Sequence, residues 1–282
     1  MAIIRKKGKI LKQTEVSLPT ELSKPVGEIG GYAALLFGEK KIGKTSLAAQ
    51  FEKTVFMMFE PGAKHLSIYQ RSVNTWKEFK GYVDLLIATK EFKTVVIDPV
   101  DKCYDLCFRY VCTKLVIDHP ADEGWGKGWD AIRNEFVGTM DRLLRSGKGI
   151  IFISHGKEQE IEERGGKKYT RLTNTMKGQA KECIEGAVDI WAHYGYEGRE
   201  RVLTILGDDF IDAGHRLNEP PTPRFLYTNG KPIRKIPMGK SSKEAYENFM
   251  KAFNNQLIEE GGKESAQPLK KKLGIKLKSK IK

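Results

Sequence analysis

Long hydrophobic runs and a cysteine framework are both missing from this chain of 282 residues. No window approaches the roughly 20 unbroken apolar residues that a membrane helix needs, which excludes a membrane-spanning protein. The first twelve residues are basic but contain neither a long apolar run nor a small-residue cleavage site, unlike a secretory signal. Four cysteines are too few for a disulfide scaffold. We therefore expect a cytoplasmic protein with no membrane partner.

The cysteines do not have the spacing of a metal site. Cys103, Cys107 and Cys112 lie on one predicted helix, but positions 103 and 112 are about half a turn apart at 3.6 residues per turn, so three thiolates cannot converge. We expect these side chains to be buried as small apolar groups. Trp125 and Trp129, one helical turn apart, are expected to pack in the core.

Positive charge is abundant, and it is concentrated at the two ends of the chain. The formal net charge is +13. Residues 1–12 contribute five positive charges and residues 263–282 contribute seven, which leaves a single net charge for residues 13–262. Basic arms on a nearly neutral body are compatible with a polyanion partner, and equally with solvated tails that only aid solubility.

Buried apolar runs alternate with amphipathic segments through the first half of the chain. This alternation predicts a parallel sheet covered by helices on both faces. Residues 156–180 contain two polar strands around Gly165-Gly166, which is typical of a β-hairpin. The predicted strands are 32–37, 55–59, 95–97, 149–154, 158–163, 167–173, 187–194 and 201–206. The predicted helices are 44–51, 76–89, 100–116, 131–145 and 242–258.

A phosphate-binding motif lies between the first predicted strand and the first predicted helix. The segment Gly38-Glu-Lys-Lys-Ile-Gly-Lys-Thr45 matches G-x-x-x-x-G-K-[ST]. Its glycines let backbone N–H groups turn toward phosphate oxygens, and the helix N-terminus adds its positive dipole. Lys44 would bridge the β- and γ-phosphates, and Thr45 would bind Mg²⁺. The candidate nucleotide-binding residues are Gly38, Glu39, Lys40, Lys41, Ile42, Gly43, Lys44, Thr45 and Ser46.

Polar residues end three further buried strands, at the edge where the phosphate loop is expected. Asp98 ends the strand at 95–97 and is the candidate second ligand of Mg²⁺, with Asp101 as a weaker substitute. Glu60 can polarise water for attack on the γ-phosphate, although an acid that only forms a turn before Pro61 fits as well. His155 ends a fourth strand and can bind the γ-phosphate.

Together these segments resemble phage-encoded RecA-like ATPases of the single-strand-annealing and recombination type. The resemblance covers roughly residues 28–220. The segments that carry it are Gly38–Thr45, Phe59-Glu-Pro-Gly62, Val95-Val-Ile-Asp98, Gly126-Lys-Gly-Trp129 and Ile151-Phe-Ile-Ser-His155. It implies a RecA-like α/β fold, ATP with Mg²⁺, DNA-stimulated hydrolysis, and a location in the host cytoplasm if the gene is phage-encoded.

The resemblance also implies roles for single residues. Glu60 would activate water, and His155 would sense the γ-phosphate and report it to the following DNA-contacting segment. The late basic motif of the family, typically Lys-x-Arg, is matched here only by Arg216, which would act on the phosphate of a neighbouring subunit. The implied partners are single-stranded DNA, further copies of the chain in a ring or filament, and a single-strand-binding protein.

The hairpin supplies the candidate nucleic-acid contacts. Cations with an interleaved aromatic suit a single strand, because charge follows the phosphates and a ring stacks on a base. The candidates are Lys167, Lys168, Tyr169, Arg171 and Lys177. Four glutamates dilute this charge, so an ordinary solvated hairpin fits the same segment. The tail after residue 261 fits a disordered basic tail, a strand added to a neighbour's sheet, or a segment that folds on DNA.

We therefore expect three parts, a basic arm at 1–27, a RecA-like ATPase core at 28–260 and a lysine-rich tail at 261–282. The expected function is an ATP-dependent recombinase or annealing protein that binds single-stranded DNA. Two alternatives stay open. One is a nucleotide-gated adaptor in phage replication or packaging, and the other is a small-molecule kinase, for which no arginine-rich lid is evident.

Overall fold

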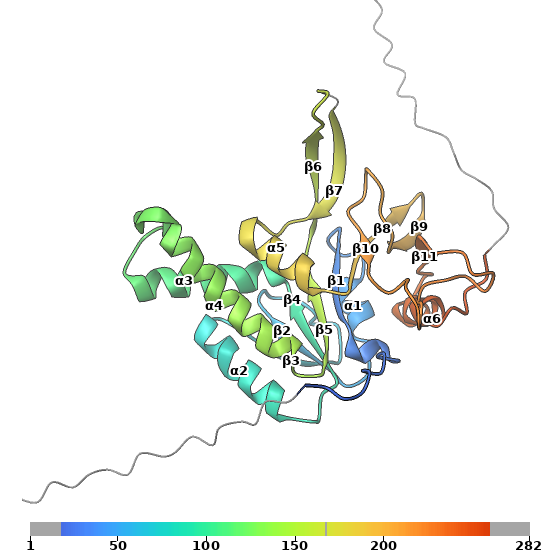
Figure 1. Ribbon diagram of the computed structural model, residues 1–282, viewed down its shortest axis with the longest axis horizontal. Coiled ribbons are helices and arrows are strands. Elements are labelled where there is room, and N and C mark those ends of the chain that lie inside the picture. Colours follow the sequence, from blue (N-terminus) through green and yellow to red (C-terminus); the bar gives the residue numbers. More distant parts are fainter. Residues whose placement is uncertain (1–17, 167, 260–282) are drawn as a thin grey trace, which may run out of the picture.

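A mostly parallel β-sheet forms the centre of the molecule in the computed structural model, which describes residues 18–166 and 168–259 (Figure 1). Its central strands are nearly continuous apolar runs, because helices cover both faces. In spatial order the strands are β11 (Lys235–Pro237), β9 (Glu200–Thr204), β8 (Ile190–Glu197), β1 (Ala33–Gly38), β5 (Gly149–Ile153), β4 (Thr94–Asp98), β2 (Thr54–Met58) and β3 (Tyr69–Ser72).

The strands from β8 to β3 are all parallel to their neighbours, whereas β9 and β11 are antiparallel. A short strand, β10 (Gly214–His215), pairs antiparallel with the start of β8. In the register, Leu36 of β1 lies beside Ile153 of β5, and Phe152 beside Ile97 of β4. The carboxyl ends of these strands therefore meet at one edge of the sheet.

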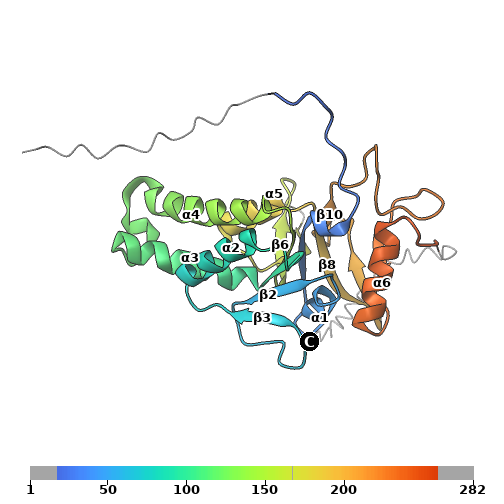
Figure 2. The ribbon, with the colours of Figure 1, turned by 90° about the horizontal axis from the view of Figure 1, so that it is seen from below.

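Two helical layers enclose the sheet, as Figure 2 shows. One layer consists of α2 (Trp76–Ala88), α3 (Val100–Leu115), α4 (Lys127–Leu144) and α5 (Gly178–Ala187), and the other of α1 (Lys44–Ala48) and α6 (Ser242–Phe253). Thr75 and Ser241 cap α2 and α6, since each side chain accepts a hydrogen bond from the backbone N–H three residues on. Within the described residues, three short 3₁₀ helices lie in the connections. They are η1 (Ile29–Gly31) before β1, and η2 (Pro120–Asp122) and η3 (Gly124–Gly126) between α3 and α4.

Each face of the sheet has its own apolar core. Trp76, Phe79 and Phe136 dominate the core beneath α2 to α5, while Phe56 and Phe249 lie in the core beneath α1 and α6. The indole N–H of Trp76 donates to Glu135 Oε1 at 2.9 Å, so this large buried ring has no unpaired donor.

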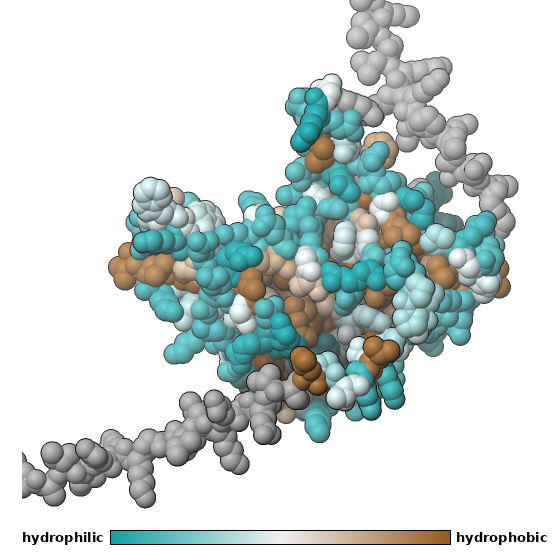
Figure 3. Space-filling view, viewed as in Figure 1, coloured by the Kyte–Doolittle hydropathy of each residue, from teal (hydrophilic) through white to brown (hydrophobic). Residues whose placement is uncertain are grey.

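A two-stranded hairpin, β6 (Gly156–Glu162) and β7 (Lys168–Asn174), stands out from the body (Figure 1). Most of its visible surface is hydrophilic in Figure 3. Because β6 begins three residues after β5 ends, the hairpin starts at the same sheet edge as the phosphate loop.

The topology confirms the predicted α/β architecture, a mostly parallel sheet flanked by helices with a hairpin insertion. Some details differ. The segment at 187 ends helix α5, which was not predicted because Gly178 and Gly186 mask its helical pattern. The strands β3, β10 and β11 were also not predicted, because exposed or very short strands carry no apolar run. Helices α1 and α6 end three and five residues earlier than predicted.

The cysteines are buried as the sequence predicts, whereas two tryptophans are not. Cys103, Cys107 and Cys112 are buried, as predicted. The prediction for the tryptophans is wrong, because Trp125 is 99% exposed at the tip between α3 and α4, with a φ of +62°, and Trp129 is 36% exposed. Residues 1–17 of the basic arm predicted at 1–27, and the whole tail at 261–282, lie outside the described residues. No helix within residues 18–166 and 168–259 is long and apolar enough to cross a membrane.

The contrast between two tryptophans gives a test of the core. Trp76→Ala should lower the free energy of unfolding by about 3–5 kcal/mol, because it opens a cavity and leaves Glu135 without one donor. Trp125→Ala should change it by less than about 0.5 kcal/mol, since that side chain contacts almost nothing. Urea denaturation followed by circular dichroism measures both. Equal effects of the two substitutions would contradict this description of the core.

Candidate functional site

A cleft of about 570 Å³ opens at the sheet edge where β1, β2, β4 and β5 end. Its volume is within the range of small-molecule sites. Three polar strand-end residues from the sequence analysis, Glu60, Asp98 and His155, line it together with the phosphate loop. The structure therefore brings together the residues that were predicted from separate strands. Of the predicted loop residues, Lys40, Lys41, Gly43, Lys44, Thr45 and Ser46 line the cleft directly.

The phosphate loop is shaped by Gly43 and anchored by Ile42. Gly43 has a φ of +111°, a conformation that L-residues with a side chain rarely adopt, and it immediately precedes the first turn of α1. Ile42 is buried in the core beneath α1, which fixes the loop to the body. The residues at the start of α1 line the cleft, and backbone N–H groups at such a position can bind an anion.

Lys44 is held inside the loop by the loop's own carbonyl groups. Its Nζ donates to Gly38 O at 2.8 Å and to Glu39 O at 2.7 Å. Burial lowers the pKa of Lys44 to about 8, although the carboxylates of Asp98 and Asp101 act in the opposite direction. A buried ammonium that gains phosphate oxygens recovers the interactions it lost with water, so the position is suited to binding an anion.

Thr45 and Asp98 form the candidate cation site. Thr45 Oγ1 donates to Asp98 Oδ2 at 2.7 Å, and both groups face the cleft. Burial raises the pKa of Asp98, which the hydrogen bond from Thr45 partly offsets. A hydroxyl and a carboxylate are hard oxygen donors of the kind that Mg²⁺ prefers, and a cation here would favour the ionised form of this buried acid. The residues present therefore fit a nucleotide-bound Mg²⁺.

Glu60 and His155 face each other across the cleft. His155 Nε2 lies 3.6 Å from Glu60 Oε1, and both side chains are partly exposed. The other ring nitrogen of His155, Nδ1, is buried and has no hydrogen-bond partner among the described residues. A carboxylate paired with an imidazole at the phosphate end of a cleft can orient and deprotonate water.

Two residues from the sequence analysis lie away from this constellation. Arg216 is exposed, its N–H donates to Asp189 O, and its Nη2 donates to Gly186 O, near the start of β8 and thus at the opposite sheet edge. It does not reach the cleft of its own chain. Asp101 hydrogen-bonds with Ser154 and Thr175 instead of Thr45, so it does not substitute for Asp98.

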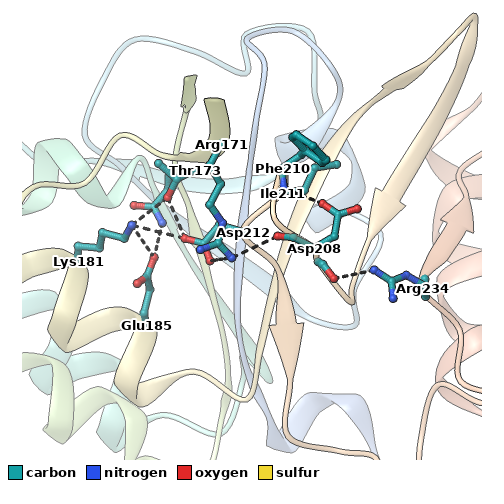
Figure 4. Close-up of polar contacts among 11 residues, drawn as sticks. Arg171, Thr173, Lys181, Glu185, Asp208, Phe210, Ile211, Asp212 and Arg234 are labelled. Atoms are coloured by element: carbon teal, nitrogen blue, oxygen red, sulfur yellow. Dashed lines mark hydrogen bonds and ion pairs between the residues drawn. The ribbon is translucent and has the colours of Figure 1, made fainter. Parts of the chain in front are cut away.

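The predicted nucleic-acid contacts are mostly engaged with other parts of the chain. Lys168 lies 2.9 Å from Glu160, and Tyr169 packs edge-to-face with Phe210. Arg171 Nη2 lies 3.5 Å from Asp212 Oδ1 and also donates to Asp208 O, as Figure 4 shows. Lys177 is exposed just before α5, and Lys167 is outside the described residues.

Sequence reasoning missed two basic residues near the loop. Arg201 of β9 donates twice to Gly239 O, at 3.0 and 2.8 Å, and a methyl group built on Gly43 would lie 3.5 Å from its Nη1. His193 of β8 packs against Phe37, and burial, with a smaller contribution from Lys44, lowers its pKa to about 4. No sequence spacing links these two positions to the phosphate-loop motif. The strands β8 and β9 come near the loop only because they pair beside β1 in the folded sheet.

The affinity for a nucleoside triphosphate should fall as the pH rises through about 8, the pKa of Lys44 in the free protein. Only the ammonium attracts phosphate oxygens, so each pH unit above this value should weaken binding by about tenfold. Calorimetric titration with a non-hydrolysable triphosphate measures this profile. Lys44→Ala should remove binding at every pH, while Lys90→Ala, at an exposed site, should leave the profile unchanged. An affinity that is constant up to about pH 9.5 would contradict the assignment.

Comparison with known proteins finds a matching family, a related protein and solved structures. Residues 31–217 match a family model described as an AAA domain. A stretch of 148 residues, half of the chain, is 26% identical to the SPbeta prophage-derived uncharacterized protein YorG of Bacillus subtilis (strain 168), and the match covers 45% of that protein. Among solved structures, the KaiC-like protein PH0186 of Pyrococcus horikoshii OT3 aligns with a TM-score of 0.40 and 16% identity, over 76% of this chain and 87% of that one.

The family match covers well over half of the chain. It includes the phosphate loop, Glu60, Asp98, His155 and Arg216. The chain therefore belongs to the AAA domain family and is a P-loop ATPase.

Proposed function

We propose that this ATPase binds single-stranded DNA and couples ATP hydrolysis to annealing or strand exchange, as a ring or filament. The observation that carries the proposal is the origin of the hairpin. Strand β6 starts at Gly156, directly after His155, which lines the nucleotide cleft. A projecting element that begins beside the γ-phosphate position can respond to the nucleotide, and a polar hairpin offers a surface for a polyanion.

The proposed chemistry assigns a task to each cleft residue. Lys44 and the loop N–H groups would hold the phosphates, and Thr45 and Asp98 would hold Mg²⁺, which supplies charge neutralisation when it is bound. Glu60 would orient and deprotonate the attacking water. The geometry that supports this is the 3.6 Å approach of His155 to Glu60, which lets the histidine respond when a γ-phosphate occupies the space between strand ends.

The proposed DNA surface uses the cations that have no ion-pair partner among the described residues. Lys157, Arg164 and Lys177 meet this condition within the hairpin and its flanks. The basic ends of the chain add twelve of the thirteen net positive charges. Lysines that neutralise phosphates release counterions, so these ends would supply affinity without sequence preference.

Assembly is proposed on the position of Arg216. This exposed residue lies at the sheet edge opposite its own cleft, and from there it would act on the nucleotide of a neighbouring copy. A ring or filament in which each cleft faces the next chain would meet this requirement. A single-strand-binding protein is a further proposed partner, through the same DNA.

A second candidate function is phosphate transfer to a small molecule. A polar recess of about 380 Å³ lies beside the nucleotide cleft and shares Glu60 with it. Lys64, Gln70, Ser72 and Asn74 line this recess, and they would suit a hydroxylated acceptor next to a candidate base. A nucleotide-gated adaptor that binds protein instead of DNA is the remaining alternative.

Single-stranded DNA should stimulate ATP hydrolysis, because the hairpin and the cleft share the His155 strand end. Steady-state hydrolysis with and without an unstructured oligonucleotide measures this. Transfer of labelled phosphate to a nucleoside, without DNA stimulation, would favour the kinase. Hydrolysis that responds to neither compound would favour the adaptor.

A matched pair of variants locates the DNA surface. Replacing Lys157, Arg164 and Lys177 by alanine should weaken binding and reduce the log–log salt slope by up to about 2, because each phosphate contact on a single strand contributes about 0.7. Replacing Lys77, Lys90 and Lys114 by alanine removes the same charge from α2, α3 and the loop between α2 and β4, and should change little. Equal effects would show that only net charge matters and that the hairpin is not the contact surface.

Glu60→Gln should slow hydrolysis by about 10²- to 10⁴-fold while ATP affinity changes less than about twofold, since it removes a base and not a phosphate ligand. Single-turnover hydrolysis and equilibrium titration measure the two quantities. Glu52→Gln, an exposed acid that pairs with Lys93, is the control and should keep the wild-type rate. A Glu60→Gln enzyme at full rate would place the base elsewhere.

A further inference from the structure

The carboxylate of Asp101 accepts hydrogen bonds from two hydroxyl groups in different parts of the chain. It lies in the first turn of α3, three residues after Asp98. Its Oδ2 accepts from Ser154 Oγ at 2.8 Å, and its Oδ1 accepts from Thr175 Oγ1 at 2.8 Å. Both oxygens of the carboxylate therefore accept a hydrogen bond. Through them, Asp101 joins α3 to two residues that lie 53 and 74 positions further along the chain.

The two donors lie at the base of the hairpin, which we call its root, where β6 leaves the body and β7 returns to it. Ser154 is fully buried and precedes His155, after which β6 begins. Thr175 follows Asn174, where β7 ends, and its N–H donates to His155 O at 2.9 Å. Asp101 thus holds the outgoing and the returning strand of the hairpin against the helix that begins just after Asp98.

The same root touches the phosphate loop directly. A Cβ built on Gly156 would lie 3.0 Å from the Cα of Gly38, so the first residue of β6 packs against the first glycine of the loop. The N–H of Ser154 donates to Leu36 O, on the strand that leads into that loop. A shift of the loop or of His155 on nucleotide binding therefore reaches the hairpin root through direct contacts.

The returning strand is also fastened to its surroundings on the far side, as Figure 4 shows. Thr173 Oγ1 donates to Asp212 Oδ2 at 3.0 Å, and Lys181 of α5 donates to Thr173 Oγ1 at 2.9 Å. The strand end, α5 and the loop around Asp212 are consequently linked, so a displacement at Thr175 is passed on to the hairpin instead of being absorbed locally.

We propose that Asp101 is a positioning residue that couples the occupancy of the nucleotide cleft to the hairpin, through Ser154 and Thr175. This inference rests on the proposed function for its purpose, but its mechanism concerns the nucleotide and the hairpin alone. Asp101 touches neither the phosphate loop nor the cation site by hydrogen bonding, and it acts through the strand end that carries His155.

The test is hydrogen exchange of the backbone amides of residues 156–174 in the full chain, with and without a non-hydrolysable ATP analogue and Mg²⁺. The wild-type hairpin should exchange differently in the two states. Asp101→Asn and Thr175→Val should lose this difference, and Thr175→Ser, which keeps the hydroxyl, should retain it. Asp105→Asn, one turn further along α3 and paired with Lys102, is the matched control and should also retain it.

A purely structural role for Asp101 would change hairpin exchange equally in both states and leave the nucleotide-dependent difference intact. Nucleotide binding is confirmed for each variant by titration at pH 7, below the pKa of Lys44. A wild-type hairpin that ignores the nucleotide, or a Thr175→Val hairpin that still responds, would overturn the proposal. Should Asp101→Asn fail to fold, the Thr175 pair alone decides.

DNA stimulation of hydrolysis, measured on the same variants, separates this inference from the proposed function. Loss of the exchange difference together with loss of stimulation supports both. A nucleotide-dependent hairpin in a wild-type protein that DNA does not stimulate would refute the DNA-binding function and leave the coupling in place. Full stimulation in Asp101→Asn and Thr175→Val would refute the coupling alone.

Discussion

Parallel pairing of β1 with β5, and of β5 with β4, is the constraint on which the rest of the structure depends. Parallel strands end at the same edge, so this pairing places the phosphate loop, Asp98 and His155 within one cleft. The strand β5 lies between the other two, and its continuation is the hairpin. These two backbone ladders therefore decide both where the cleft forms and where the projecting hairpin starts.

The charged groups of the cleft are held in a state that favours ligand binding. Burial disfavours the ammonium of Lys44 and the carboxylate of Asp98. It therefore lowers the pKa of Lys44 and raises the pKa of Asp98. Lys44 is satisfied by two loop carbonyls and Asp98 by the hydroxyl of Thr45. Phosphate oxygens and a divalent cation would compensate the same desolvation more fully, so the cost of burying these groups is recovered on binding.

The hairpin is polar on its surface but well connected at its root. Two of its candidate DNA-binding cations are paired with acids, Lys168 with Glu160 and Arg171 with Asp212. Its root, in contrast, contacts the phosphate loop at Gly38 and α3 at Asp101. Under the proposed function, the hairpin would follow the nucleotide state through its root. The few cations without an ion-pair partner among the described residues, and the charge at the chain ends, would supply its affinity for a polyanion.

The sequence by itself determined the fold class, the phosphate loop from Gly38 to Thr45 and the strand-end acids, because these depend on local patterns: apolar runs, a fixed motif and residues that end strands. It also placed Glu60 and His155 at one edge, since parallel strands require it. Only the tertiary structure decided that Arg201 lies beside Gly43, that Asp101 binds Ser154 and Thr175, and that Trp125 is exposed. These features join or separate residues far apart in the chain, and side-chain packing, which no local pattern encodes, selects them.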